Sequence, residues 1–113
     1  MSVTEISIAE LKTKIDAIEP SRLLLLEALP ERHYTSGHLP GARHLPHDQA
    51  RALAEIVAPD KRAEIVVYCS NRACANSHIA AGVLAGLGYD NVRVFAAGKQ
   101  AWQEAGFALE GGQ

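Results

Sequence analysis

The sequence predicts an α/β fold in which buried parallel strands alternate with crossover helices. Segments of helical period alternate along the chain with short apolar runs of strand length, the pattern of parallel strands joined by helices. No internal repeat, low-complexity tract or interdomain linker interrupts this alternation, and the length of 113 residues suits one domain spanning residues 1–113. Nearly half of the residues are apolar, which is enough to build a core without disulfides or a metal.

The first predicted helix and strand lie in the N-terminal part of the chain. Ser7 and Glu10 have the spacing of a helix capping box. The helix is expected to end before Pro20, and its apolar residues at helical intervals are Ile8, Leu11, Ile15 and Ile18. The leucine run at 23–26 predicts a strand buried on both faces, although such a run taken alone also fits a helix.

A loop and a second helix follow this strand. Residues 36–46 contain two prolines, two glycines and two histidines, a composition that predicts irregular structure. The second helix should end at Pro59, and the apolar residues that share one of its faces are Ala50, Leu53, Ala54 and Val57.

The second half of the chain contains the clearest strand, residues 65–68, which runs directly into Cys69. A helical stripe begins near Asn76 and is expected to end at Gly88, a residue suited to a helix C-terminus. Residues 92–95 predict another strand, and a last short helix carries Trp102, which is expected to anchor the core. The tail from residue 110 onwards is expected to be loose.

The charge balance and the cysteine content exclude several classes of protein. Eleven basic and 13 acidic side chains are mixed along the chain, so neither a nucleic acid nor an anionic membrane is expected as a partner. No apolar run approaches the ~20 residues that a membrane helix needs, and the N-terminus lacks the features of a secretory signal. Two cysteines are too few for a secreted disulfide framework. A cytoplasmic protein is therefore expected.

Cys69 is the candidate catalytic residue, because ligands of α/β sheets bind at the carboxyl ends of the strands. Cys69 lies at such an end, just before a helix N-terminus that offers unpaired amides and the positive end of its dipole. Amides converging on the sulfur should stabilise a thiolate and lower the pKa of Cys69, making it a nucleophile. The competing interpretation is a small buried apolar residue at the end of a strand.

The residues after Cys69 favour the functional interpretation, since they are polar or small and offer no apolar packing surface. We expect this loop to form an anion-binding site, and its residues are Ser70, Asn71, Arg72, Ala73, Cys74, Ala75, Asn76 and Ser77.

Four stretches, in this order, resemble the rhodanese family of sulfurtransferases. Residues 31–42 are similar to the signature that ends in G-H-I-P-G-A, and residues 65–69 together with 87–92 are similar to its "VVYC" and "LGYDNV" segments. Residues 98–106 match the closing "GGxxAWxxAG" pattern. Together the stretches cover a core of about residues 7–108.

This resemblance implies a three-layer domain with a central parallel sheet of about five strands and helices on both faces. It also implies a cysteine, here Cys69, that accepts sulfane sulfur from a small donor such as thiosulfate or a persulfide. The resulting persulfide then passes its outer sulfur to a thiophilic acceptor in a ping-pong scheme. The donor or the acceptor can also be a protein, and no cofactor is implied.

Three positions depart from the family pattern and leave the natural donor open. Leu29 stands where the family usually has an arginine after the first core strand. If Ser77 is the family's loop serine, the loop is two residues longer than the common one. The usual loop arginine is missing, and Arg72 stands at a different offset.

Several other residues each admit two interpretations. Cys74 is either a resolving thiol, which attacks a Cys69 persulfide to form a disulfide, or a packing residue. Arg72 either steers anionic donors or is a solvated side chain, and Glu27 either orders the loop amides or is a hydrogen-bonded carboxylate.

The histidines are expected to be structural. The family pattern suggests structural hydrogen bonding for His38, and His78 fits an exposed helix position better than a role in tuning Cys69. The spacing of His44, His47 and His78 from the cysteines matches no usual zinc arrangement, so no metal is expected.

Two functions of other classes remain open beside sulfur transfer. The chain can be a non-catalytic binding or regulatory module, or a thiol–disulfide sensor that uses Cys69 and Cys74. A cysteine phosphatase or arsenate reductase is disfavoured, because those enzymes need an arginine six residues after the cysteine and Ala75 occupies that position.

Overall fold

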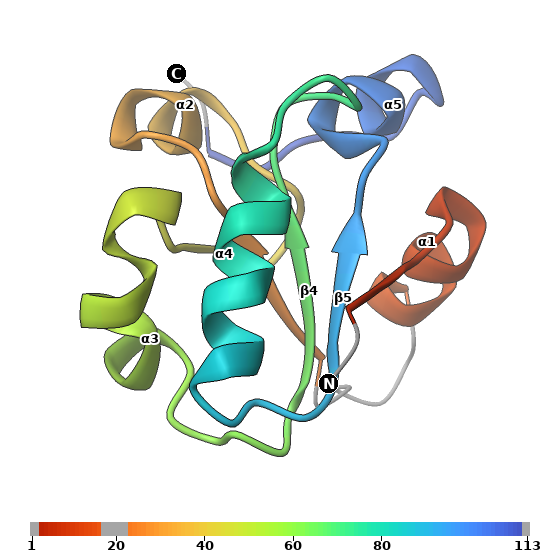
Figure 1. Cartoon of the computed structure of the whole chain (residues 1–113). Coiled ribbons are helices and arrows are strands. Elements are labelled where there is room, and N and C mark those ends of the chain that lie inside the picture. Colours follow the sequence, from red (N-terminus) through yellow and green to blue (C-terminus); the bar gives the residue numbers. More distant parts are fainter. Residues whose placement is uncertain (1–2, 17–22, 112–113) are drawn as a thin grey trace.

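The computed structural model describes residues 3–16 and 23–111 and contains a five-stranded, all-parallel sheet (Figure 1). The strands lie in the order β1-β5-β4-β2-β3. Their bounds are Thr4–Glu5 (β1), Leu23–Glu27 (β2), Arg43–His44 (β3), Glu64–Tyr68 (β4) and Val92–Phe95 (β5). The predicted fold class is confirmed, and β4, which leads into Cys69, is the central strand.

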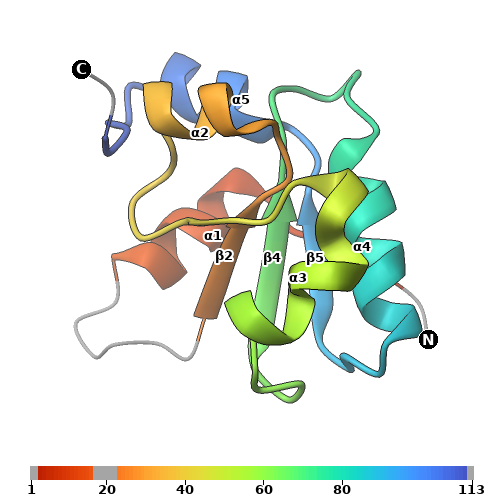
Figure 2. The ribbon, with the colours of Figure 1, turned by 90° about the vertical axis from the view of Figure 1, so that its left-hand side faces the viewer.

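Helices cover both faces of this sheet (Figures 1 and 2). Helices α3 (Ala50–Val57) and α4 (Asn76–Gly86) bury their apolar residues against one face, in a core that includes Leu26 and Val67. Helices α1 (Ile8–Ile15) and α5 (Gly98–Glu104) pack on the other face. Trp102 is only 1% exposed in this second core, which confirms its predicted role as an anchor.

The local signals at the helix ends behave largely as the sequence predicts. Ser7 caps α1 by accepting a hydrogen bond from the amide of Glu10 at 3.1 Å. Gly88 follows α4 with a φ of +99°, a conformation that glycine adopts at little cost. Helix α1 ends at Ile15, and the predicted continuation to Ile18 and Pro20 lies outside the described residues.

Four short elements were not predicted. Helix α2 (Glu31–Ser36) buries no residue, so it lacks an apolar stripe, and the 3₁₀ turn His47–Gln49 is three residues long. Strands β1 and β3 have two residues each and are too short to show a period. The loop predicted at 36–46 is therefore interrupted by β3.

The expectation of a loose tail is wrong for Glu110. Its backbone forms an antiparallel bridge with His38, with amide-to-carbonyl distances of 2.9 and 2.7 Å in the two directions. Its carboxylate also accepts a hydrogen bond from the amide of Gly41 at 2.7 Å. The C-terminal segment thus fixes the loop between α2 and β3.

In the part of the chain that the structure describes, no helix is long and apolar enough to span a membrane.

Candidate active site

Cys69 lies at the carboxyl edge of the sheet, where the loops after the parallel strands gather (Figure 1). It follows Tyr68, the last residue of β4, and the loop that it begins ends at Asn76, the first residue of α4. Its side chain is buried, since the residue is only 1% exposed. The predicted position between a central strand and a helix N-terminus is therefore observed.

The environment of the Cys69 sulfur differs from the expected one. The thiol donates a hydrogen bond to the backbone carbonyl of Cys74, and the Ser77 hydroxyl lies within hydrogen-bond distance of the same sulfur, each contact at 3.3 Å. Burial raises the pKa of Cys69, and the contact with Cys74 raises it further, while the hydroxyl and the amide of Ser77 act in the opposite direction. The prediction of a lowered pKa is wrong for Cys69, because burial of the sulfur disfavours the charged thiolate.

Cys74 has the lowered pKa instead. Burial alone would raise the pKa of this half-buried thiol, but the contact with the Cys69 side chain and hydrogen bonds from the amides of Asn76 and Ser70 and from the Ser70 hydroxyl together lower it. Asn76 and Ser77 lie in the first turn of α4, where backbone amides have no partner within the helix. The predicted converging amides therefore exist, but they are divided between the two sulfurs.

The start of α5 is hydrogen-bonded to the beginning of the loop that follows β4. The amides of Lys99 and Gln100 donate to the carbonyls of Cys69 and Ser70 at 2.9 and 2.8 Å. Gly98 adopts a φ of +72°, and a Cβ built on it would lie 2.7 Å from the Cys69 carbonyl oxygen. Only glycine permits this close approach of the two backbones, so α5 and the cysteine loop form one packed unit.

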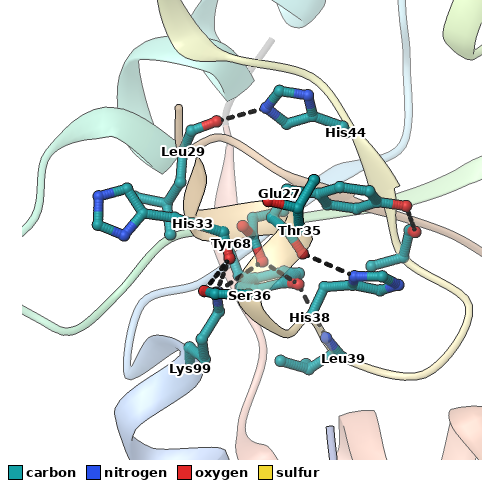
Figure 3. A network of polar contacts seen from close by, with 12 residues as sticks. Glu27, Leu29, His33, Thr35, Ser36, His38, Leu39, His44, Tyr68 and Lys99 are labelled. Atoms are coloured by element: carbon teal, nitrogen blue, oxygen red, sulfur yellow. Dashed lines mark hydrogen bonds and ion pairs between the residues drawn. The ribbon is translucent and has the colours of Figure 1, made fainter. Parts of the chain in front are cut away.

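A buried polar network lies at the same edge of the sheet (Figure 3). Glu27 is fully buried, and one of its oxygens accepts a 2.7 Å hydrogen bond from the Tyr68 hydroxyl and pairs with the Lys99 ammonium at 3.1 Å. The Lys99 ammonium also donates to the carbonyl of His33 at 3.0 Å, and the Tyr68 hydroxyl accepts from the amide of Leu39 at 3.0 Å. The network therefore connects the ends of β2 and β4 with α2 and α5.

Comparisons with known proteins support the same fold. The rhodanese-like domain family matches residues 7–105. This chain belongs to the rhodanese-like domain family.

Solved structures similar to this rhodanese-like chain share little of its sequence. The BH2092 protein from Bacillus halodurans is 24% identical with a TM-score of 0.86, over 96% of this chain and 77% of that chain. The human single-domain sulfurtransferase TSTD1 is 20% identical with a TM-score of 0.76, over 91% and 97%. A thiosulfate sulfurtransferase from Pseudomonas aeruginosa is 24% identical with a TM-score of 0.79, over 98% of this chain but 21% of that one. No curated protein matches the chain significantly.

The remaining candidates of the rhodanese-like site differ in exposure and in contacts. Arg72 is exposed and forms a 3.6 Å ion pair with Glu5. His78 is exposed on α4, as expected. Glu27 has no hydrogen bond to a loop amide. It pairs with the ammonium of Lys99, and the backbone amide of Lys99 donates to the carbonyl of Cys69. The side chain of Asn71 accepts from the amide of Ala73 at 3.0 Å and so shapes the loop itself.

His38 and His44, two of the histidines before the loop, have structural contacts. His38 stacks on the ring of Tyr34 at 4.1 Å and hydrogen-bonds its carbonyl through Nδ1 at 3.0 Å. His44 contacts the carbonyl of Leu29 through Nε2 at 2.6 Å. Within residues 3–16 and 23–111, no three His, Cys, Asp or Glu side chains gather as a metal-binding group.

Sequence reasoning missed Gly98, Lys99 and Tyr68 as parts of this site. Gly98 and Lys99 belong to the closing motif used only for the family resemblance, and Tyr68 was counted only as a strand residue. The one available signal was a buried acid, Glu27, at the end of an apolar strand, because a buried carboxylate needs a cation or several hydrogen bonds.

Proposed function

We propose that this rhodanese-like domain is a sulfurtransferase that carries sulfane sulfur as a persulfide on Cys69. The observation that carries the proposal is the position of the Cys69 thiol, between the end of the central strand and the first turn of α4, in a chain of this family. The carboxyl edge of a parallel sheet is where such folds bind their ligands.

The proposed chemistry is two successive displacements at sulfur. The Cys69 sulfur bonds to the outer sulfur of a donor, and the donor's S–S bond breaks with its electron pair on the departing group. An acceptor nucleophile then attacks the outer sulfur of the Cys69 persulfide, and the cysteine leaves as a thiolate. The sulfane sulfur keeps its oxidation state over the cycle, so no oxidant is needed.

The loop contains groups suited to an outer sulfur that carries negative charge. A persulfide on Cys69 has no S–H to donate to the carbonyl of Cys74, whereas the amide and the hydroxyl of Ser77 can both donate to it. We propose that Ser70, Asn71, Ala73, Ala75 and Asn76 shape this cradle through their backbone.

The charges near the loop favour a persulfide over thiosulfate as the donor. Arg72 is paired with Glu5, and the Lys99 ammonium is paired with Glu27 and donates a hydrogen bond to the carbonyl of His33. Thiosulfate is a dianion that needs a cation to offset its desolvation, and both of these cations are engaged. We therefore propose that thiosulfate is a poor substrate.

The contact between Cys69 and Cys74 also favours a second candidate, a thiol–disulfide sensor. Both cysteines are free thiols in the structure. A sensor would form the Cys69–Cys74 disulfide on mild oxidation and would not take up sulfane sulfur.

A sulfur-transfer assay with cyanide as the acceptor tests the proposal. With glutathione persulfide as the donor, the wild-type protein should catalyse thiocyanate formation, and Cys69→Ser should abolish it. Equal rates for the two proteins, or no catalysis by the wild type, would reject a catalytic role for Cys69.

A further inference from the structure

We propose that Cys74 is the thiol that takes sulfur from the donor and passes it to Cys69. This inference rests on the proposed function and adds a second catalytic residue to it. It assigns Cys74 to the loading step, in contrast to a resolving thiol, which would act after loading.

The first argument is access to the two sulfurs. Cys69 is 1% exposed, so a donor as large as an alkyl persulfide cannot reach its sulfur without movement of the loop. Cys74 is only half-buried and lies in the same loop. Its backbone carbonyl is 3.3 Å from the Cys69 sulfur, so the two residues are in direct contact. A donor that approaches the loop therefore meets Cys74 more readily than Cys69.

The second argument is the protonation of the two sulfurs. The attacking species in sulfur exchange is the thiolate. The contact with the Cys69 side chain and hydrogen bonds from the amides of Asn76 and Ser70 and from the Ser70 hydroxyl oppose the effect of burial and lower the pKa of Cys74, whereas burial raises the pKa of Cys69. At neutral pH the half-buried sulfur of Cys74 is consequently better ionised than the buried sulfur of Cys69.

The third argument is the direction of transfer within the pair. A thiol of lower pKa leaves faster in thiol exchange, and a thiolate of higher pKa is intrinsically more nucleophilic. When a sulfur is carried on Cys74, the leaving group is therefore the thiolate of lower pKa, and Cys69 becomes the stronger nucleophile once it has lost its proton. The same pKa order disfavours the reverse transfer, from Cys69 back to Cys74.

The steps balance without an outside oxidant. The Cys74 thiolate bonds to the outer sulfur of the donor persulfide, and the donor thiolate leaves. The Cys69 thiol then loses its proton to solvent, its sulfur bonds to that same outer sulfur, and the bond to Cys74 breaks with its electron pair on Cys74.

Peptide mapping can follow the sulfur, because Arg72 lies between the two cysteines. Trypsin cleavage at this arginine places Cys69 in residues 63–72 and Cys74 in residues 73–93. The protein is mixed with glutathione persulfide, quenched with an alkylating agent at successive times and mapped by mass spectrometry. In the wild type, the extra sulfur should appear first on residues 73–93 and then on residues 63–72.

Two variants extend this measurement. Cys69→Ser should trap one sulfur atom on Cys74. Cys74→Ser should load Cys69 about tenfold more slowly or worse, because the remaining nucleophile is mostly a neutral thiol. Cys74→Ala, which lacks any hydroxyl, should be equally slow, and the thermal unfolding midpoints of both variants report whether they fold. The wild-type time course keeps the test valid if a variant does not fold.

Three outcomes would overturn the relay. They are loading of Cys69 at the wild-type rate in Cys74→Ser, no sulfur on Cys74 in Cys69→Ser, and a Cys69–Cys74 disulfide with release of sulfide in the first turnover. Loading of Cys69 at the wild-type rate in Cys74→Ser would leave the proposed function intact, since Cys69 still takes up sulfur. Failure of the proposed function gives a different result, in which neither tryptic peptide of the wild type gains sulfur.

Discussion

The thiol of Cys69 donates a hydrogen bond to the backbone carbonyl of Cys74 over 3.3 Å. Burial raises the pKa of Cys69, while the side chain of Cys74 is more exposed and has the lower pKa. The two cysteines of the loop therefore differ in both access and ionisation, and the first prediction below depends on this difference.

The pH dependence of alkylation should separate the two cysteines. The thiolate fraction at a given pH is larger for the group of lower pKa, so the reaction of Cys74 with iodoacetamide should reach half of its maximal rate at a lower pH than that of an ordinary thiol. Cys69 should react more slowly and reach half of its maximal rate at a higher pH than an ordinary thiol. Rates for residues 63–72 and 73–93, measured by mass spectrometry from pH 5 to about 10, test this order. In denaturant the two rates should converge, and unequal rates there would assign the difference to local sequence.

Replacing Ser77 by alanine should slow the reactions of Cys69. The hydroxyl and the amide of Ser77 lower the pKa of Cys69, so loss of the hydroxyl should raise that pKa further. One hydrogen bond to a charged group is worth about 1.5 kcal/mol or more, so persulfide turnover should fall about tenfold. Thr13→Val, which removes a hydroxyl from the exposed side of α1, is the matched control and should leave turnover unchanged. Unchanged turnover in Ser77→Ala would remove Ser77 from the site.

Gly98→Ala should damage both stability and activity, and Gly106→Ala is its control. Both glycines have positive φ, +72° and +87°, so each alanine should cost about 1–2 kcal/mol in backbone strain. A Cβ at residue 106 meets nothing within 4 Å, whereas one at residue 98 meets the Cys69 carbonyl at 2.7 Å. Urea unfolding should show a larger loss for Gly98→Ala, by roughly 1–3 kcal/mol, and only this variant should lose sulfur transfer. Equal losses would argue against close packing of α5 on the loop.

Lys99→Met should destabilise the fold more than the loss of a surface charge would. Its side chain is 12% exposed and its partner Glu27 is fully buried, so the substitution leaves a buried carboxylate without its cation. Removal of one partner from a buried ion pair costs about 3–5 kcal/mol. The double variant Glu27→Gln/Lys99→Met keeps an acceptor for the Tyr68 hydroxyl and should recover most of this loss in urea unfolding. Additive losses from the two substitutions would show that the pair is not coupled.

The fold was predictable where an element is long enough to display its period. Helix α4 and strands β4 and β5 carry continuous apolar patterns, and their positions follow from the sequence alone. Strands β1 and β3 pair at the sheet edges over two residues each. Such short pairings depend on contacts made in the folded domain and leave no periodic pattern in the sequence. Helix α2 buries none of its residues, so nothing in its composition distinguishes it from a loop.

The candidate site was predictable in position but not in electrostatics. A cysteine between a buried strand and a helix start is visible in the sequence. The direction of its S–H depends on where the loop places the Cys74 carbonyl, and that follows from the packing of α5 on the loop. The pairing of Glu27 with Lys99 likewise joins the end of β2 to the start of α5, which only the folded topology brings together.

The location of sulfur in the loaded wild-type protein tests the central claim most directly. After reaction with glutathione persulfide and removal of the donor, residues 63–72 should carry one additional sulfur atom on Cys69, and cyanide should remove it. A protein that retains the mass of the free thiol on this peptide under the same conditions would contradict sulfur transfer through Cys69.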